Sequence, residues 1–187
     1  MRIFINPGHS INDGEDNGAR GNGLIEAEVA LNISNRVARY LQAIGYTVNV
    51  FQSNWLESIV DVANYWDADL FVSIHCNAAP DELAGQIRGT ETFYHDYSAE
   101  GRILATAIQR RIVHEIPTVD RGIKVGELFV TKYTDAPAVL VETAFIDNTD
   151  DAKLLVEYED NFARAIACGI TDYFLHERPI PDVFDDY

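Results

Sequence analysis

Two histidines and two glutamates stand where side chains could bind a metal ion or transfer protons. His9, His75 and Glu142 each end or follow a β-branched run that predicts a strand. Glu26 opens an amphipathic segment in phase with its apolar positions, so its carboxylate should point toward the sheet. Ligands of open parallel sheets bind beyond the carboxyl ends of the strands, so we expect these four groups at one edge.

These side chains together would support metal-assisted hydrolysis. Two imidazoles and one carboxylate are a known ligand set of catalytic zinc, with a further position open for water. His9, Glu26 and His75 would fill this set with one Zn²⁺ per chain. The ion would lower the pKa of its water toward about 7 and polarise a carbonyl oxygen. Glu142 would then accept a proton from water and return it to the leaving amine.

Each of these residues also has an ordinary structural interpretation. A histidine at a strand end is commonly hydrogen-bonded or solvated, and a glutamate in the first turn of a helix is favoured by the helix dipole. Glu142 could pair with an arginine. No HExxH element is present in the chain. Spacing alone therefore leaves the metal site and the structural interpretation both open.

The elements that would position these residues alternate between short β-branched runs and longer periodic segments. This pattern predicts an α/β fold: a single domain with a twisted, mostly parallel sheet of about six strands, flanked by helices on both faces. Strands are predicted at 2–6, 46–51, 70–75, 90–94, 127–131 and 138–142, and helices at 26–44, 55–65 and 98–114. One last helix, capped within 147–150, aligns Phe162, Ile166, Ile170 and Tyr173, and long loops are predicted at 10–23 and 77–88.

The composition indicates a globular protein and limits the kinds of partner that it can bind. The chain has 187 residues, of which 47% are apolar and 24% charged, as in a globular protein that buries a core. Residues 1–174 are predicted to form the catalytic domain, and 175–187 an extended or disordered tail. The net charge of −16 argues against nucleic acid and anionic lipid as partners. No apolar run is long enough to span a membrane, and we expect a monomer.

Other candidate sites are weaker. Cys76 and Cys168 are predicted to be free thiols, and Cys76 should point to the face of its strand opposite His75. The acidic residues Asp13, Glu15 and Asp16 lack the spacing of a calcium loop, so a solvated acidic loop is expected. The chain has no GxSxG, P-loop or GxGxxG motif, which argues against the commonest serine hydrolase and nucleotide-binding classes.

Four motifs in order resemble one family of cell-wall enzymes. They are Asn6-Pro7-Gly8-His9, Gly23-Leu24-Ile25-Glu26, Val72-Ser73-Ile74-His75-Cys76-Asn77, and the segment 139–148, VLVETAFIDN. In this order, over roughly residues 2–174, the chain resembles the zinc-dependent N-acetylmuramoyl-L-alanine amidases (amidase type 3), found in autolysins and phage endolysins.

The resemblance implies both a reaction and roles for the four residues. His9, Glu26 and His75 match the family's zinc ligands, and Glu142 matches its catalytic glutamate. The implied reaction is hydrolysis of the amide between N-acetylmuramic acid and L-alanine in peptidoglycan or muropeptides. The implied place of action is the cell wall, outside the cell. No export signal is visible in this chain, so a segment absent from it or a phage-type release would have to supply the route.

Some positions depart from the family pattern. The family usually has Asp where Asn6 stands, a second Gly where Ser10 stands, and a Thr-Arg segment in place of Phe51-Gln52-Ser53. We expect the change at position 6 to weaken the support of a ligand and to make activity modest. Two alternatives remain: a metallopeptidase that uses the same ligands and cuts within the stem peptide, or a wall-binding or regulatory module with little or no turnover, which these departures suggest.

Overall fold

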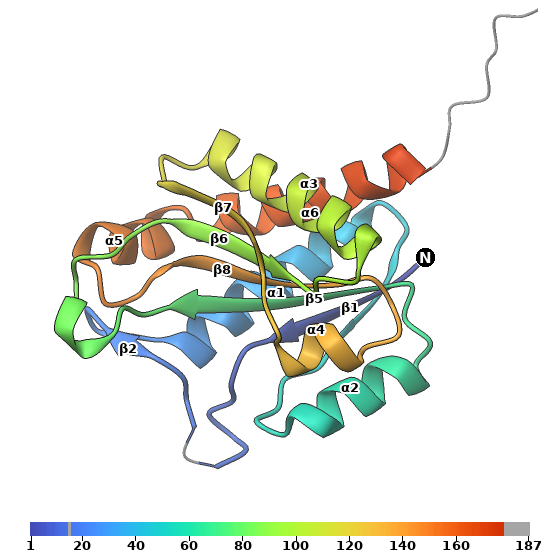
Figure 1. Ribbon diagram of the computed structural model, residues 1–187, viewed down its shortest axis with the longest axis horizontal. Helices are drawn as coiled ribbons and strands as arrows, with labels where there is room; N and C mark the ends of the chain where they lie inside the picture. Colours follow the sequence, from blue (N-terminus) through green and yellow to red (C-terminus); the bar gives the residue numbers. More distant parts are fainter. Residues whose placement is uncertain (15, 178–187) are drawn as a thin grey trace, which may run out of the picture.

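A six-stranded sheet forms the centre of the protein. The computed structural model describes residues 1–14 and 16–177. The strands run in the order β4-β1-β5-β8-β6-β7, and all pairs are parallel except β6 with β8 (Figure 1). Their bounds are β1 (Arg2–Pro7), β4 (Thr47–Val50), β5 (Leu70–Asn77), β6 (Thr90–Tyr94), β7 (Asp120–Val125) and β8 (Ala138–Phe145). The predicted α/β architecture with a mostly parallel sheet is confirmed.

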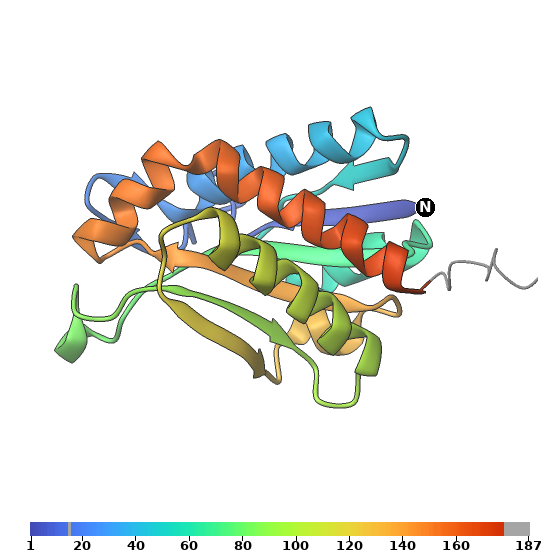
Figure 2. The ribbon, with the colours of Figure 1, turned by 90° about the horizontal axis from the view of Figure 1, so that it is seen from above.

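Helices cover both faces of the sheet, as predicted. They are α1 (Glu26–Ala43), α2 (Leu56–Tyr65), α3 (Ala99–Glu115), α4 (Phe129–Tyr133), α5 (Thr149–Glu157) and α6 (Glu159–Glu177). The long helices α1, α3 and α6 share one face, with α6 between the other two (Figure 2). The short helices α2 and α4 lie on the opposite face (Figure 1). None of the described helices is both long and apolar enough to cross a lipid bilayer.

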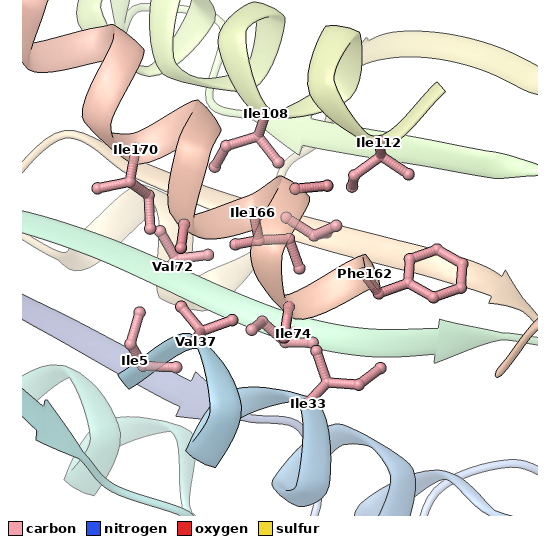
Figure 3. Packing of buried hydrophobic residues seen from close by; sticks show 14 of the residues in the cluster. Ile5, Ile33, Val37, Val72, Ile74, Ile108, Ile112, Phe162, Ile166 and Ile170 are labelled. Atoms are coloured by element: carbon pink, nitrogen blue, oxygen red, sulfur yellow. The ribbon is translucent and has the colours of Figure 1, made fainter. Parts of the chain in front are cut away.

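The larger core lies between the sheet and the three long helices. Figure 3 shows side chains of β1 and β5 meeting those of α1, α3 and α6. The central strands are buried on both faces, because alternate residues pack into this core and into a smaller one under α2 and α4. Phe71 faces the smaller core, so Ser73 and His75, two and four residues further on, share its face. This alternation places His75 on the same face of the sheet as α2 and α4.

The strand predicted at 127–131 is wrong. Residues 129–131 belong to α4, and the strand at the sheet edge is β7, which was not predicted. Val130 and Thr134 are both buried, and the hydroxyl of Thr134 bonds back to the carbonyl of Val130 at 2.7 Å. This four-residue repeat is helical, but five residues are too few for periodicity alone to decide.

Two other boundaries differ from the predictions. The predicted single last helix is two helices, because α5 ends at Glu157 and α6 begins at Glu159. The predicted cap is present, since the side chain of Asn148 accepts the backbone N–H groups of Asp150 and Asp151. The loop at 10–23 ends in a hairpin of β2 (Arg20–Gly21) with β3 (Leu24–Ile25). Helix α6 continues to Glu177, and the rest of the predicted tail, 178–187, lies outside the described residues.

Candidate metal centre

Three of the four candidate side chains converge at the carboxyl ends of β1 and β5. One ligand atom from each of His9, Glu26 and His75 lies within 4.8 Å of the other two. The rings of His9 and His75 stand edge to face, with centroids 5.3 Å apart. Residues from three distant parts of the chain therefore form one cluster.

The chain reaches this arrangement through an unusual backbone conformation. His9 has φ = 54°, in the left-handed region that costs a non-glycine residue about 1–2 kcal/mol. The preceding Gly8 packs against His75, and a Cβ at position 8 would lie 2.4 Å from the imidazole ring. A strained histidine beside a glycine brings the two rings together. Such strain is typical of functional sites.

Glu26 is the buried carboxylate at the centre of the cluster. Its Oε2 accepts the backbone N–H of Ala19 at 2.7 Å, and its Oε1 accepts that of Cys76 at 3.1 Å. The same oxygens face Nε2 of His9 at 3.4 Å and Nδ1 of His75 at 2.9 Å. Burial raises the pKa of Glu26, but the hydrogen bond to His75 and the two histidine charges outweigh it, so the net pKa is lowered. Glu26 is therefore held as a carboxylate.

The proton of His9 is fixed on the nitrogen that points away from Glu26. Nδ1 of His9 lies 2.9 Å from Oδ1 of Asp16, which also accepts the backbone N–H of Gly18. A carboxylate only accepts hydrogen bonds, so Nδ1 is the protonated nitrogen. Nε2, the nitrogen that faces Glu26, is then the one left to bind a metal ion.

A buried chain of hydrogen bonds fixes the proton of His75 in the same way. Asn6 donates from Nδ2 to the carbonyls of Pro7 and Phe51, so its Oδ1 is left to accept the hydroxyl of Ser73 at 2.8 Å. The Ser73 oxygen must then accept from Nε2–H of His75, at 3.1 Å. Nδ1, the nitrogen that faces Glu26, is then the one left to bind a metal ion. Asn6 keeps an acceptor for Ser73 and makes two donations that a carboxylate could not make.

This distribution of protons fits a bound cation. One nitrogen of each imidazole faces the carboxylate of Glu26, and the partners Asp16 and Ser73 bind the other nitrogen of each ring. Such an array is repulsive unless additional protons or a divalent cation occupy its centre. Two imidazoles and one carboxylate with ordered partners are the donor set of a transition-metal site with open positions. His9, Glu26 and His75 are therefore the candidate ligands.

Glu142 lies beside this cluster but outside it. It is in register with His75 on the neighbouring strand, and with Glu91 on its other side. Its Oε2 is buried and, among the described residues, has no hydrogen-bond partner. Burial raises the pKa of Glu142 well above its usual value, and the charges of Glu26 and Glu91 raise it further. The alternative pairing with an arginine does not occur within the described residues.

A pocket opens over the cluster. Its volume is about 280 Å³, and its polar wall includes both candidate histidines and Asp16. Leu128, Phe129 and other apolar side chains line it as well. A larger cavity, of about 710 Å³, lies over α3 and contains none of the candidate ligands. The smaller pocket therefore combines apolar side chains with the candidate histidine ligands.

Two supporting residues of the site were not identified from the sequence. Asp16 was expected to be a solvated loop residue, and only the fold shows that it orients His9. Ser73 could have been found, since a residue two positions before His75 on a strand shares its face. Cys76 faces the opposite side, as predicted, and its thiol lies in the large core.

Substituting Gly18 by alanine should weaken metal binding about 10–100-fold, the range seen when groups that support ligands are disturbed. A Cβ at position 18 would lie 2.5 Å from Oε2 of Glu26 and 2.6 Å from the ring of His9. Gly14→Ala is a matched control, because Gly14 also has a positive φ but has nothing within 4 Å of the added carbon. Competition against a chromophoric chelator measures both affinities. Equal affinities in the two variants would contradict this packing.

Comparisons with known proteins show the family of this chain. Residues 3–172 match the family model described as N-acetylmuramoyl-L-alanine amidase. The amidase LytC of Bacillus subtilis is 41% identical over 92% of this chain, which spans only 35% of LytC. The amidase AmiC2 of Nostoc punctiforme has the same fold, with a TM-score of 0.84 and 32% identity over 94% of this chain and 97% of that one. An amidase structure from Clostridium difficile 630 gives a TM-score of 0.84 with 28% identity, over 95% and 98%. The chain therefore belongs to the N-acetylmuramoyl-L-alanine amidase family.

Proposed function

We propose that this chain is a zinc-dependent hydrolase of the amide bond that joins N-acetylmuramic acid to L-alanine. His9, Glu26 and His75 hold one Zn²⁺, and Glu142 carries the proton. The observation that supports this most is the convergence of two imidazole nitrogens on the buried Glu26, with Glu142 beside them. Membership of the amidase family supports the choice of substrate bond.

The bound ion supplies a polarised carbonyl and a water of lowered pKa. The other functions belong to the chain itself. Asp16 and Ser73 hold the two imidazoles with their free nitrogens toward Glu26. Glu142 accepts the proton of the attacking water, for which its raised pKa makes it a stronger base than an ordinary glutamate. The protonated carboxyl then donates to the leaving nitrogen of alanine.

The pocket contributes orientation and exclusion of water. Leu128 and Phe129 offer apolar contact to the substrate near the polar groups of the site. A partly apolar wall keeps the local dielectric low, which strengthens the interactions of the charged groups. The small volume, about 280 Å³, suits the atoms around one scissile bond and not a whole glycopeptide. The rest of the substrate lies along the surface outside.

We infer that the natural substrate is peptidoglycan or its soluble muropeptides, and that the chain acts outside the cell, at the wall. The resemblance to wall amidases supports this place of action. A monomer suffices, because every group of the proposed site comes from one chain. LytC is nearly three times as long as the segment it shares with this chain.

The decisive experiment is product analysis on purified muropeptides. The zinc-loaded chain should release stem peptides that begin with a free alanine amine and leave the sugar intact, as mass spectrometry can identify. A product with alanine still attached to the sugar would indicate a metallopeptidase that cuts within the stem. Inactive protein that pellets with cell walls and binds no zinc would indicate a binding module. Either result would refute the proposed function.

A further inference from the structure

A row of charged side chains crosses the sheet from the candidate metal centre toward its edge. His75 on β5, Glu142 on β8 and Glu91 on β6 occupy consecutive register positions, so they share one face. Glu91 in turn binds two cations of the edge strand β7: Nε of Arg121 at 2.6 Å and Nζ of Lys124 at 2.5 Å. The row therefore begins at the metal centre and ends in a pair of cations.

The charges at the end of this row do not balance. Glu91 is only 4% exposed, and its other oxygen accepts Nδ2 of Asn77 at 2.9 Å. One carboxylate thus serves two cations, and neither cation has an ion pair with another carboxylate among the described residues. The chain as a whole has 30 acidic and 14 basic residues, so its composition favours the opposite imbalance. A buried carboxylate needs a partner, but a single cation would neutralise it.

Both cations are held in place and remain accessible. The side chains of Arg121 and Lys124 keep 30% and 37% of their surface exposed. Arg121 lies over the ring of Phe145, with its guanidinium carbon 5.0 Å from the centroid. Among the described residues, Arg121 reaches Glu91 through Nε alone, and the other N–H groups of the guanidinium remain for a ligand. Lys124 likewise has three donors, of which Glu91 uses one.

We propose that Arg121 and Lys124 form a binding site for a carboxylate of the stem peptide. This inference rests on the proposed function, which places the scissile amide at the metal centre and Glu142. The edge strand β7 lies two strand spacings from β8, or about 10 Å. An extended peptide advances about 3.3–3.6 Å per residue. The bound carboxylate therefore belongs to the second or third residue of the stem.

The site also addresses the repulsion between a chain of charge −16 and an anionic peptide. The two cations offset this repulsion at the point where the peptide leaves the scissile bond. The competing interpretation is that both cations only stabilise the buried Glu91. In that case their loss would affect all substrates alike, whatever charge the substrate carries.

Two synthetic muramoyl peptides separate these interpretations. One has free carboxylates on the second and third residues, and the other has the same groups as primary amides. For the native zinc-loaded chain, KM should be about fivefold lower for the free carboxylates, the effect of one partly exposed ion pair. Lys124→Met should remove this preference: KM rises about fivefold for the acidic peptide only, and kcat stays within about twofold.

Lys132→Met is the matched control. Lys132 is similarly exposed but pairs with Glu127 beside α4, outside the row, so the preference should persist in this variant. An equal rise of KM for both peptides in Lys124→Met would overturn the proposal. If the native chain cleaves neither peptide, the proposed function fails, and calorimetry with the same peptides decides the binding site. Tighter binding of the acidic peptide that is lost in Lys124→Met supports the site, and equal binding of the two peptides overturns it.

Discussion

Replacing Glu142 by glutamine should abolish amide hydrolysis while the metal stays bound. Glu142 is not among the three converging ligands, so its amide should leave zinc affinity close to that of the native chain. Glutamine cannot accept the proton of the attacking water, and loss of a general base typically costs about 10²–10⁴ in rate. Initial rates on muropeptides, with zinc content measured on the same samples, check both parts. Activity within a few-fold of the native chain would refute the role of Glu142.

The same variant also reports on burial of the carboxyl. The folded pKa of Glu142 lies well above the usual 4.5, so the stability from this group is complete below that value and is lost as pH rises through the folded pKa. In the metal-free chain, Glu142→Gln should therefore lose less stability than the native chain between pH 5 and 8. Urea unfolding across this range measures the difference. Glu127→Gln, at an exposed position, serves as the control for both activity and stability.

Replacing Glu26 by glutamine should remove the metal and the activity together. Glu26 is the one anionic ligand of the three, and both of its oxygens face an imidazole nitrogen. A neutral amide removes the charge and turns an N–H₂ group toward one of the ligand positions. Zinc affinity should fall by more than about 100-fold, beyond the effect of changes outside the ligand set. Dialysis against a zinc buffer, followed by elemental analysis, measures this loss.

Glu28→Gln is the matched control for this substitution. Glu28 lies in the same first turn of α1 but is exposed to solvent, so this variant has the same change of charge without a change of ligand. It should bind one zinc per chain and keep native activity. Native zinc affinity in Glu26→Gln would contradict the ligand assignment. Equal losses in the two variants would point instead to a general effect of charge at the start of the helix.

The elements that could be predicted are those whose buried residues form a long, regular pattern of apolar positions in the sequence. The central strands β5 and β8 are continuous apolar runs because both of their faces are covered, and α1 shows a clear stripe of buried positions. Edge strand β7 was missed because its residues are half-exposed and largely polar, and Gly122 lies near a shift in its pairing with β6. Exposed strands carry little hydrophobic pattern.

The sequence could predict only those residues of the candidate site that the strands position. His75 and Glu142 lie in the carboxyl-terminal halves of neighbouring strands, so an α/β topology alone brings them together. The role of Asp16 depends on the path of a long loop, which no local pattern specifies. The departure at Asn6 could be listed from the sequence, but its two donations to backbone carbonyls become visible only in the structure.

The most direct test of the metal centre is anomalous diffraction at the zinc edge from crystals of the zinc-loaded chain. We predict one strong peak bonded to Nε2 of His9, a carboxylate oxygen of Glu26 and Nδ1 of His75, at about 2.0–2.2 Å. Glu142 should lie beside this peak without bonding to it. A fully loaded crystal in which the zinc contacts other residues, and none lies among these three, would contradict the account.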